Sequence, residues 1–246
     1  MKYHSLILCL FFLFSCAEKK QESSEEKYAT ITKTDSEILI DAIADEAAWQ
    51  STEWQILDQL WLGELQDSAD FSGRYKILWD SRAVYVLAEI HDDTLIDIYE
   101  DPLVQYWDDD CLEIFIDEDN SKGLHQYNHN AFAYHIALDG NVADIGTDSL
   151  PRLYNDHIES KRITVGNKST WEVSMKLFRD DYKDGGDNTP RELSSLDKIG
   201  FAIAYCDNDT SELRETFIGS EVVEGEDKNR GWIDAGIFRS YILKEE

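Results

Sequence analysis

The sequence predicts an all-β protein, a β-sandwich of two antiparallel sheets of the immunoglobulin-like or jelly-roll type with long loops. Apolar side chains occupy every second position in residues 84–91, 111–117 and 171–177, as in strands with one buried face. Turn signals such as Asp139-Gly140-Asn141 separate these runs. No segment keeps a 3.6-residue period beyond a turn or two, so the sheets have no long helices to pack against.

The same patterns place the individual elements along the chain. Strands are expected, in chain order, at 28–33, 37–41, 74–80, 84–91, 111–117, 130–138, 142–146, 158–166, 171–177, 199–206, 213–219 and 237–243. The best short helix is Asp45–Trp49. No interior linker rich in Pro, Gly or Ser divides the chain, and we therefore expect one domain over residues 28–246.

The N-terminus has the composition of an export signal. Lys2 precedes an apolar core at residues 6–14, which is too short to span a bilayer as a helix. Leu13-Phe14-Ser15-Cys16 resembles the bacterial lipobox, and a charged run follows at once. We expect a signal peptide at 1–15 and a tether at 16–27 lipidated on Cys16, which anchors the protein in the bacterial cell envelope, on the periplasmic or surface face of the outer membrane. An ordinary signal peptide with an incidental Cys16 is the alternative.

The charge balance restricts the possible partners. The chain has 51 acidic and 23 basic side chains, a net charge of −28; without residues 1–15, which hold only Lys2, it would be 22 − 51 = −29. Nucleic acid and anionic membrane surfaces are therefore excluded as partners, apart from contact through the lipid anchor. Disorder is also excluded, because 42% of the residues are apolar and 12% aromatic. We expect a monomer.

Two cysteines would remain in the exported chain, since Cys9 leaves with the signal peptide and Cys16 is acylated. Cys111 and Cys206 permit one disulfide in an oxidising compartment. Both lie in strand-like runs, so two small buried thiols are the other possibility.

Motifs for catalysis are weak in this sequence. Glu113 and Asp117 share a strand face but would lie about 13 Å apart, which is too far for the carboxyl pair of a glycosidase. A cross-strand carboxyl pair stays open, whereas Gly-x-Ser-x-Gly and His-Glu-x-x-His are absent. His125 and His129 have the spacing of zinc ligands only if they lie on a helix, and this stretch leads into a strand.

Calcium is a more plausible metal than zinc, because it binds hard oxygen ligands in loops. Two acidic runs supply such ligands, and the candidates are Asp117, Asp119, Asp207 and Asp209. A chain this acidic also forms such runs by chance, so a structural calcium is an expectation with weak ligand candidates.

Two tryptophans occupy polar loops. Trp107 precedes Asp108-Asp109-Asp110, and Trp232 follows the polar stretch 226–231, whereas Trp79 and Trp171 lie in strands and are expected in the core. A large aromatic side chain in a polar loop either caps the core or presents a flat face to a ligand. Sugar rings have apolar C–H faces that suit such a surface.

Several ordered motifs resemble carbohydrate-binding module family 9. Residues 39–49 resemble its opening motif, with Ala42 where the family usually has glycine, and 76–92 its second block. The most specific resemblance is Trp107-Asp-Asp-Asp-Cys-Leu-Glu-Ile-Phe-Ile-Asp117. Matches at Trp171-Glu172-Val173, Gly200-Phe201 and 231–238 follow in family order, so that the resemblance covers roughly residues 37–243.

The resemblance implies a β-sandwich that binds sugar chain ends between two tryptophans, usually with structural calcium. It implies Trp107 and Trp232 as the clamp, Glu113 as an acceptor for sugar hydroxyls, and Asn229 and Asp110 as neighbouring ligand-binding residues. The family's arginine and glutamine fall near Ala133 and Ala204, so their hydrogen bonds must come from elsewhere. Tyr127, Asn128, Asn130 and Asp207 are the candidates, with turn chemistry as the alternative for the two asparagines.

The sequence therefore favours an exported lipoprotein that binds carbohydrate in polysaccharide uptake or carbohydrate catabolism, and it favours a binding module over an enzyme. The expected ligand is a neutral oligo- or polysaccharide, because the acidic chain repels uronates and sulfated glycans unless calcium inverts the local field. A hydrolase of O-glycosyl bonds and a non-catalytic structural or docking lipoprotein are the alternatives.

Overall fold

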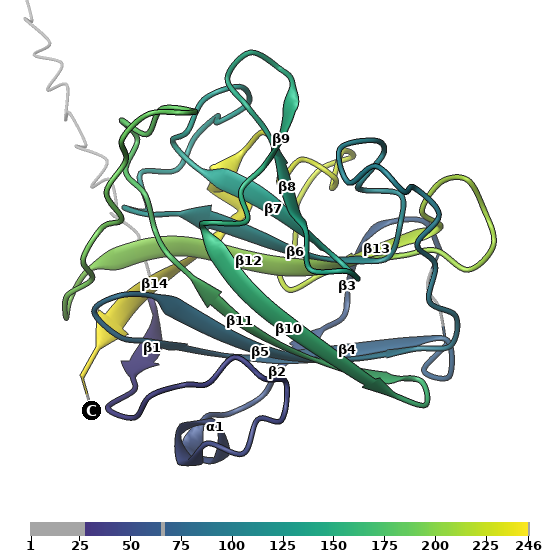
Figure 1. Cartoon of the computed structure of the whole chain (residues 1–246), viewed down its shortest axis with the longest axis horizontal. Coiled ribbons are helices and arrows are strands. Elements are labelled where there is room, and N and C mark those ends of the chain that lie inside the picture. The colour runs from purple at the N-terminus through teal and green to yellow at the C-terminus, as the bar shows by residue number, and fades with distance from the viewer. Residues whose placement is uncertain (1–27, 65–66, 246) are drawn as a thin grey trace, which may run out of the picture.

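The computed structural model describes residues 28–64 and 67–245 (Figure 1). The predicted signal peptide at 1–15 and the predicted tether at 16–27, with Cys16, lie outside these residues and stay predictions. Within the described part of the chain, no helix combines the length and the apolar composition that a membrane crossing requires.

Strands are the main regular structure of the described residues. The strands are β1 (Ala29–Lys33), β2 (Gln55–Leu57), β3 (Gln59–Leu62), β4 (Phe71–Trp79), β5 (Val84–Asp92), β6 (Cys111–Asp117), β7 (Phe132–Ala137), β8 (Val142–Ile145), β9 (Pro151–Leu153), β10 (Ile158–Val165), β11 (Lys168–Met175), β12 (Lys198–Asp207), β13 (Thr216–Gly219) and β14 (Arg239–Lys244). One short helix, α1 (Ala47–Ser51), and one 3₁₀ turn, η1 (Ala235–Ile237), complete the set.

The strands are hydrogen-bonded in one continuous order, β10-β11-β5-β4-β1-β14-β12-β6-β7-β8-β9. This ladder folds back on itself where β1 and β14 join the two layers (Figure 1). β1 is parallel to both β14 and β4, whereas the other strand pairs in the described residues are antiparallel.

One hydrophobic core lies between the two layers. Ile77, Val86 and Val173 of β4, β5 and β11 belong to the same buried cluster as Ile114 and Ile203 of β6 and β12. These side chains occupy alternate strand positions, which is how a sandwich buries the inner faces of both sheets. The predicted β-sandwich is therefore confirmed.

The core also contains the two tryptophans assigned to it from the sequence. Trp79 and Trp171 are each 1% exposed. Their burial separates them from Trp107 and Trp232, which are 40% and 37% exposed.

The outer face of the β4–β5–β11 layer is covered by residues 38–54, which we call the N-terminal cover. Ile38 and Trp49 from this segment pack with Leu78, Tyr85 and Leu87 in a second buried cluster. Figure 1 shows α1 lying against this side of the molecule.

Several element predictions need correction. Residues 37–41 form no strand, because side chains bind their backbone: Leu39 N–H donates to Glu46 and Asp41 N–H donates to Glu172. The helix begins at Ala47 instead of Asp45. The short strands β2, β3 and β9 have three or four residues each, too few for a recognisable alternation. The other predicted strands are present with ends shifted by a few residues.

The two cysteines are buried free thiols and form no disulfide. Cys111 of β6 lies directly opposite Cys206 of β12 in the antiparallel register. Of the two possibilities left by the sequence, the structure shows the pair of small buried thiols.

Candidate functional site

The outer face of the β6–β7–β12 layer carries the candidate site. Glu113 of β6 lies opposite His135 of β7 and Ala204 of β12, so the three residues share one face of the sheet. Phe115, two residues along β6, lies on the same face opposite Ala133 and Ala202. The residues at the alternate positions of these three strands belong to the core between the two layers. The face that carries Glu113 and Phe115 therefore points away from the other layer.

A pocket of about 330 Å³ opens on this face. We call it the tryptophan pocket, and its lining residues are Tyr106, Trp107, Glu113, Phe115, Tyr127, His135, Asp144, Ile145, Arg214, Asn229 and Trp232. Trp107 comes from the loop before β6 and Trp232 from the segment before η1, so two exposed indoles from distant parts of the chain line one cavity.

Glu113 organises the polar side of the pocket. Its Oε1 lies 2.7 Å from His135 Nε2 and accepts hydrogen bonds from Arg214 Nη1 at 3.2 Å and from the Cys206 thiol at 3.0 Å. Oε2 accepts no hydrogen bond from any other described residue. Burial alone would raise the pKa of Glu113, but His135 and Arg214 together hold it below its ordinary value. Glu113 is therefore an ionised acceptor with one oxygen free for a ligand.

Arg214 is held by contacts on both sides of its guanidinium. Besides Glu113, it donates to Cys206 Sγ at 3.0 Å and lies 4.3 Å above the ring of Phe217. A planar guanidinium fixed in this way presents its remaining N–H groups in a defined direction.

Asp144 is the second carboxyl group in the pocket. It is buried, and its two oxygens accept the backbone N–H groups of Ala133 at 2.9 Å and Ile145 at 2.7 Å. Burial raises the pKa of Asp144 to about 7. Near neutral pH this carboxyl is partly protonated and can donate a hydrogen bond as well as accept one.

The structure brings together some of the candidates selected from the sequence. Trp107, Glu113, Tyr127, Asn229 and Trp232 all line the tryptophan pocket. Ala133 and Ala204 are buried on the same sheet face, do not line the pocket and offer no polar side chain, in line with the departure from the family pattern.

Asp110, Asn128, Asn130 and Asp207 do not line the pocket. Asp110 is buried and accepts the N–H groups of Ile96 and Asn208, so it holds two loops together. Asn128 Oδ1 accepts the N–H of Asn130 at 2.9 Å, which is the turn chemistry considered as the alternative for these asparagines.

Four residues that sequence reasoning missed supply much of the chemistry of the pocket: Tyr106, His135, Asp144 and Arg214. His135 could have been found only from the register between β6 and β7, because it lies directly opposite Glu113. Arg214 falls within the strand expected at 213–219, but β13 begins only at Thr216, so Arg214 lies in the loop after β12, where strand alternation does not fix the direction of its side chain.

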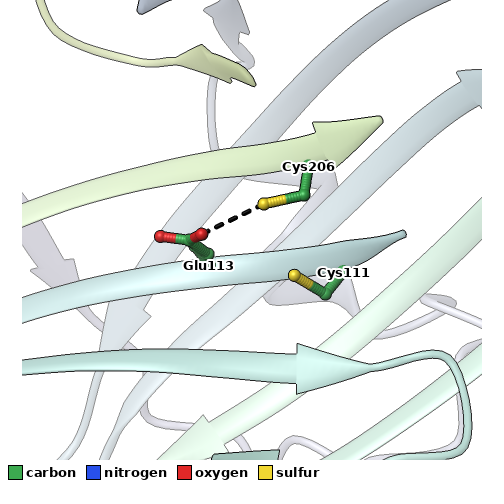
Figure 2. A group of neighbouring side chains, drawn as sticks. All are labelled: Cys111, Glu113 and Cys206. Carbon is green, nitrogen blue, oxygen red and sulfur yellow. Dashed lines mark hydrogen bonds between the residues drawn. The ribbon is translucent and has the colours of Figure 1, made fainter. Parts of the chain in front are cut away.

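Cys111, Glu113 and Cys206 form a compact buried group beneath the pocket (Figure 2). Their sulfur and oxygen atoms lie within 4.8 Å of one another, and this donor set would suit a thiophilic metal ion. However, the Arg214 guanidinium already contacts both Cys206 and Glu113, and burial raises the pKa of both thiols. The group is therefore charge-balanced by an arginine and does not favour a cation.

A different acidic group suits calcium better. Asp92, Asp207 and Asp209 have carboxylate oxygens within 4.8 Å of one another, and Asp209 forms a second such group with Asp70 and Asp93. Burial and the neighbouring carboxylates raise the pKa of Asp207 to about 8. The structure thus unites two of the four predicted calcium candidates with three aspartates from β5 and the loops around it.

The other two calcium candidates are separated. Asp117 uses both oxygens on its own loop, accepting N–H groups from Asp119, Ser121 and Lys122. Asp119 lies in a group with Glu118 and Asp180.

The two histidines considered for zinc have different partners. His125 Nε2 lies 2.8 Å from the carbonyl of Gly231, and His129 Nε2 lies 3.2 Å from Asp184. Both are buried, and no group of metal-ligating side chains found in the described residues includes either of them.

Comparisons with known proteins agree on one family. The family model described as carbohydrate family 9 binding domain-like matches residues 40–246. A carbohydrate binding module family 9 from Caldicellulosiruptor kristjanssonii in complex with cellotriose has a TM-score of 0.64 at 18% identity, over 89% of this chain and 95% of that one. The same module in complex with glucose has a TM-score of 0.63 at 18% identity, over 89% and 97% of the two chains.

A more distant neighbour is a protein from Bacteroides uniformis described as a candidate carbohydrate-binding protein. It has a TM-score of 0.55 at 10% identity, over 89% of this chain and 99% of that one. A search of curated proteins finds no match.

Proposed function

Because the chain belongs to the carbohydrate family 9 binding domain-like family, we propose that it binds the end of a neutral oligosaccharide in the tryptophan pocket. The observation that carries the proposal is the pair of exposed indoles, Trp107 and Trp232, lining one pocket with a partly free carboxylate. The solved structures of similar fold, which contain cellotriose and glucose, support the ligand class.

Stacking and hydrogen bonding would both contribute to sugar binding. The indoles of Trp107 and Trp232 offer flat apolar faces to the C–H faces of a sugar ring. Glu113 Oε2 would accept from a sugar hydroxyl, while Arg214, anchored by Glu113 and Cys206, would donate to a sugar oxygen. A pocket that combines apolar walls with a few fixed polar groups is typical of small-ligand sites.

The charges inside the pocket support a neutral ligand. Two carboxyl groups, Glu113 and Asp144, and two basic side chains, His135 and Arg214, line it. Glu113 is balanced by its basic neighbours and Asp144 is partly protonated near neutral pH, so the pocket has no excess charge to attract a uronate. The net charge of −28 on the whole chain also repels anionic glycans.

Titration calorimetry with cellotriose and glucose tests this function. We expect Trp107→Ala and Trp232→Ala each to weaken binding about tenfold, which corresponds to about 1.4 kcal/mol of lost stacking. Trp54→Ala is the matched control, because Trp54 packs on Arg74 and Lys76 of the other layer. Wild-type affinity in both pocket variants, with the fold intact by circular dichroism, would overturn the proposal.

A hydrolase of O-glycosyl bonds is the second candidate function, and one observation favours it. Glu113 has a lowered pKa and Asp144 a pKa of about 7, so one pocket holds an ionised carboxylate and a carboxyl able to act as an acid. This candidate predicts release of reducing sugar from cello-oligosaccharides by the purified protein, abolished by Asp144→Asn. If the protein binds these oligosaccharides without hydrolysing them, the hydrolase is excluded and the binding function stands.

The cellular role proposed with this function is that of an exported lipoprotein anchored through Cys16, serving polysaccharide uptake or carbohydrate catabolism. Mass spectrometry of the N-terminal peptide and membrane fractionation of Cys16→Ser test the anchor. A lipid-free N-terminus at Cys16 in the native host would contradict it.

A structural calcium at Asp92, Asp207 and Asp209 belongs to the same proposal, with Asp70 and Asp93 beside them. Burial and repulsion between carboxylates together raise the pKa of Asp207, and a bound divalent cation would offset the repulsion. We expect calcium, but not magnesium at equal concentration, to raise the melting temperature, and Asp209→Asn to remove the effect. A melting temperature that chelator and calcium leave unchanged would exclude this site.

A further inference from the structure

One wall of the tryptophan pocket is built from two loops that lie far apart in the chain. Residues 118–131, between β6 and β7, contribute Tyr127 to the lining, and residues 220–234, between β13 and η1, contribute Trp232. An isolated antiparallel bridge joins the backbones of the two loops near these residues. The position of Trp232 therefore depends on how the two loops are held together.

His125 of the first loop holds the residues on both sides of Trp232. Its backbone N–H donates to the carbonyl oxygen of Ile233 at 3.0 Å, and its ring Nε2 lies 2.8 Å from the carbonyl oxygen of Gly231. Because a carbonyl oxygen can only accept, Nε2 carries the proton and donates this hydrogen bond. A single histidine thus fixes the backbone before and after the exposed indole.

The ring of His125 is enclosed by protein and does not line the pocket. The residue is 4% exposed, and its ring packs edge-on against Phe238 at 5.7 Å. Burial lowers the pKa of His125, so the ring is neutral near neutral pH. His125 therefore acts on the backbone beneath the pocket and not on a ligand.

Gly231 is held from a second side. A Cβ atom added to Gly231 would lie 2.8 Å from the ring of Phe115, so the backbone here rests directly on a side chain that lines the pocket. Gly231 is buried, whereas Trp232 is 37% exposed. The chain passes from a fixed, buried peptide group to an exposed indole within one residue, and a rotation of that peptide group would turn the indole.

We propose that His125 is a positioning residue for the tryptophan pocket, whose hydrogen bond to the Gly231 carbonyl sets the orientation in which the Trp232 indole meets a sugar ring. This inference rests on the proposed carbohydrate function and gives a role in it to a residue outside the pocket lining. Binding costs less entropy when a contacting side chain is already ordered, so loss of this restraint weakens binding.

Three substitutions separate the hydrogen bond of His125 from the bulk of its ring. His125→Phe keeps a ring against Phe238 but removes the donor, and His125→Asn ends too close to Cα to reach the Gly231 carbonyl. The amide nitrogen of His125→Gln occupies the position of Nε2 along the side chain and restores a donor. We expect calorimetry with cellotriose to show about fivefold weaker binding for His125→Phe and His125→Asn, the loss of about one hydrogen bond, and less than about twofold for His125→Gln.

Double-mutant cycles show whether the loss acts through Trp232. His125→Phe should weaken binding about fivefold in the wild type and in Trp107→Ala, but less than about twofold in Trp232→Ala, where no indole remains to be positioned. A general structural defect would weaken binding equally in all three backgrounds.

His129→Phe is the matched control. His129 is also 4% exposed and also bonds through Nε2, but its partner is Asp184 and it does not line the pocket. Whatever the effect of His129→Phe on the melting temperature, the affinity of the folded variant for cellotriose should equal that of the wild type.

The outcomes separate this inference from the function on which it rests. Circular dichroism checks that each variant is folded, and His125→Asn replaces His125→Phe in the cycles if the latter does not fold. Wild-type affinity in these variants, a loss of equal size in Trp232→Ala, or a His125→Gln variant as weak as His125→Phe contradicts the positioning role alone. Failure of the wild-type protein to bind cellotriose and glucose overturns the proposed function as well.

Discussion

Each layer of the sandwich carries a buried glutamate on its outer face, and the two glutamates have opposite surroundings. Glu172 of β11 is 0% exposed and binds the N-terminal cover: its carboxylate accepts the N–H groups of Asp41 and Ala42 and the indole N–H of Trp49. Glu113 of β6 is 2% exposed and contacts Arg214, His135 and Cys206 through one oxygen.

The two glutamates differ in their free acceptor capacity, and this difference underlies the roles proposed for the two faces. Neutral donors satisfy both oxygens of Glu172, and the cover leaves no room for a ligand. Arg214 balances the charge of Glu113, and both Arg214 and His135 contact Oε1, leaving Oε2 free beside a pocket. A buried carboxylate with unused acceptor capacity next to exposed indoles is the arrangement that we expect of a binding face.

The largest expected effect is on the covered face. Glu172→Ala should lower the free energy of unfolding by about 3 kcal/mol, because it leaves three donors of the cover without an acceptor. Urea unfolding measures the loss, and calorimetry should show unchanged sugar affinity once the protein is folded. Glu159→Ala on the exposed side of β10 is the control and should be nearly neutral. A stable Glu172→Ala variant would show that the cover packs without its carboxylate.

The next effect is on the pocket face. Glu113→Gln keeps the size of the side chain but removes the charge that balances Arg214, and it should weaken binding of cellotriose about tenfold. Calorimetry at neutral pH measures this loss. If Glu113→Gln binds as the wild type does and Glu172→Gln does not, the roles assigned to the two faces are reversed.

The pH dependence of the two glutamates should have opposite signs. The pKa of Glu113 lies below its ordinary 4.5, so its contribution is present above pH 4.5 and is lost as the pH falls through the folded value. Burial raises the pKa of Glu172 above 4.5, so its contribution is fully present below pH 4.5 and declines as the pH rises through the folded value.

Urea unfolding of Glu113→Gln and Glu172→Gln across pH 4 to 8 tests these signs. The destabilisation by Glu113→Gln should grow with rising pH, and that by Glu172→Gln should shrink. Parallel pH profiles would mean that the two carboxyl groups have similar environments after all.

The smallest effect concerns the backbone of the cover. Ala42 has φ of 61°, in the left-handed region that favours glycine, at the motif position where the family usually has glycine. Ala42→Gly should raise the stability by about 0.5 kcal/mol, since relief of this conformation exceeds the loss of one methyl group and the added freedom of the unfolded chain. Ala47→Gly, in the first turn of α1, should instead lower it.

Local pattern was enough to predict the sandwich and part of the pocket lining. Alternation along residues 111–117 puts Glu113 and Phe115 on one face of β6 and Ile114 on the other. The polar loops around Trp107 and Trp232 indicated exposed indoles, and both are exposed. The pattern was misleading at residues 37–41, because backbone N–H groups there donate to the side chains of Glu46, seven residues from Leu39, and Glu172, on β11, instead of to a neighbouring strand.

The sequence by itself determined which side chains alternate between the two faces of each strand and which two tryptophans lie in polar loops, because both follow from a two-residue period and from neighbouring polarity. Only the tertiary structure decided which outward-facing glutamate is covered and which is open to a ligand. Residues 38–54 close over Glu172, whereas β7 and the loop after β12 bring His135 and Arg214 to Glu113 from 22 and 101 positions away in the chain. Contacts of this kind depend on strand register and on loops that cross between layers. Non-local packing sets both of these, and no local period in the sequence predicts them.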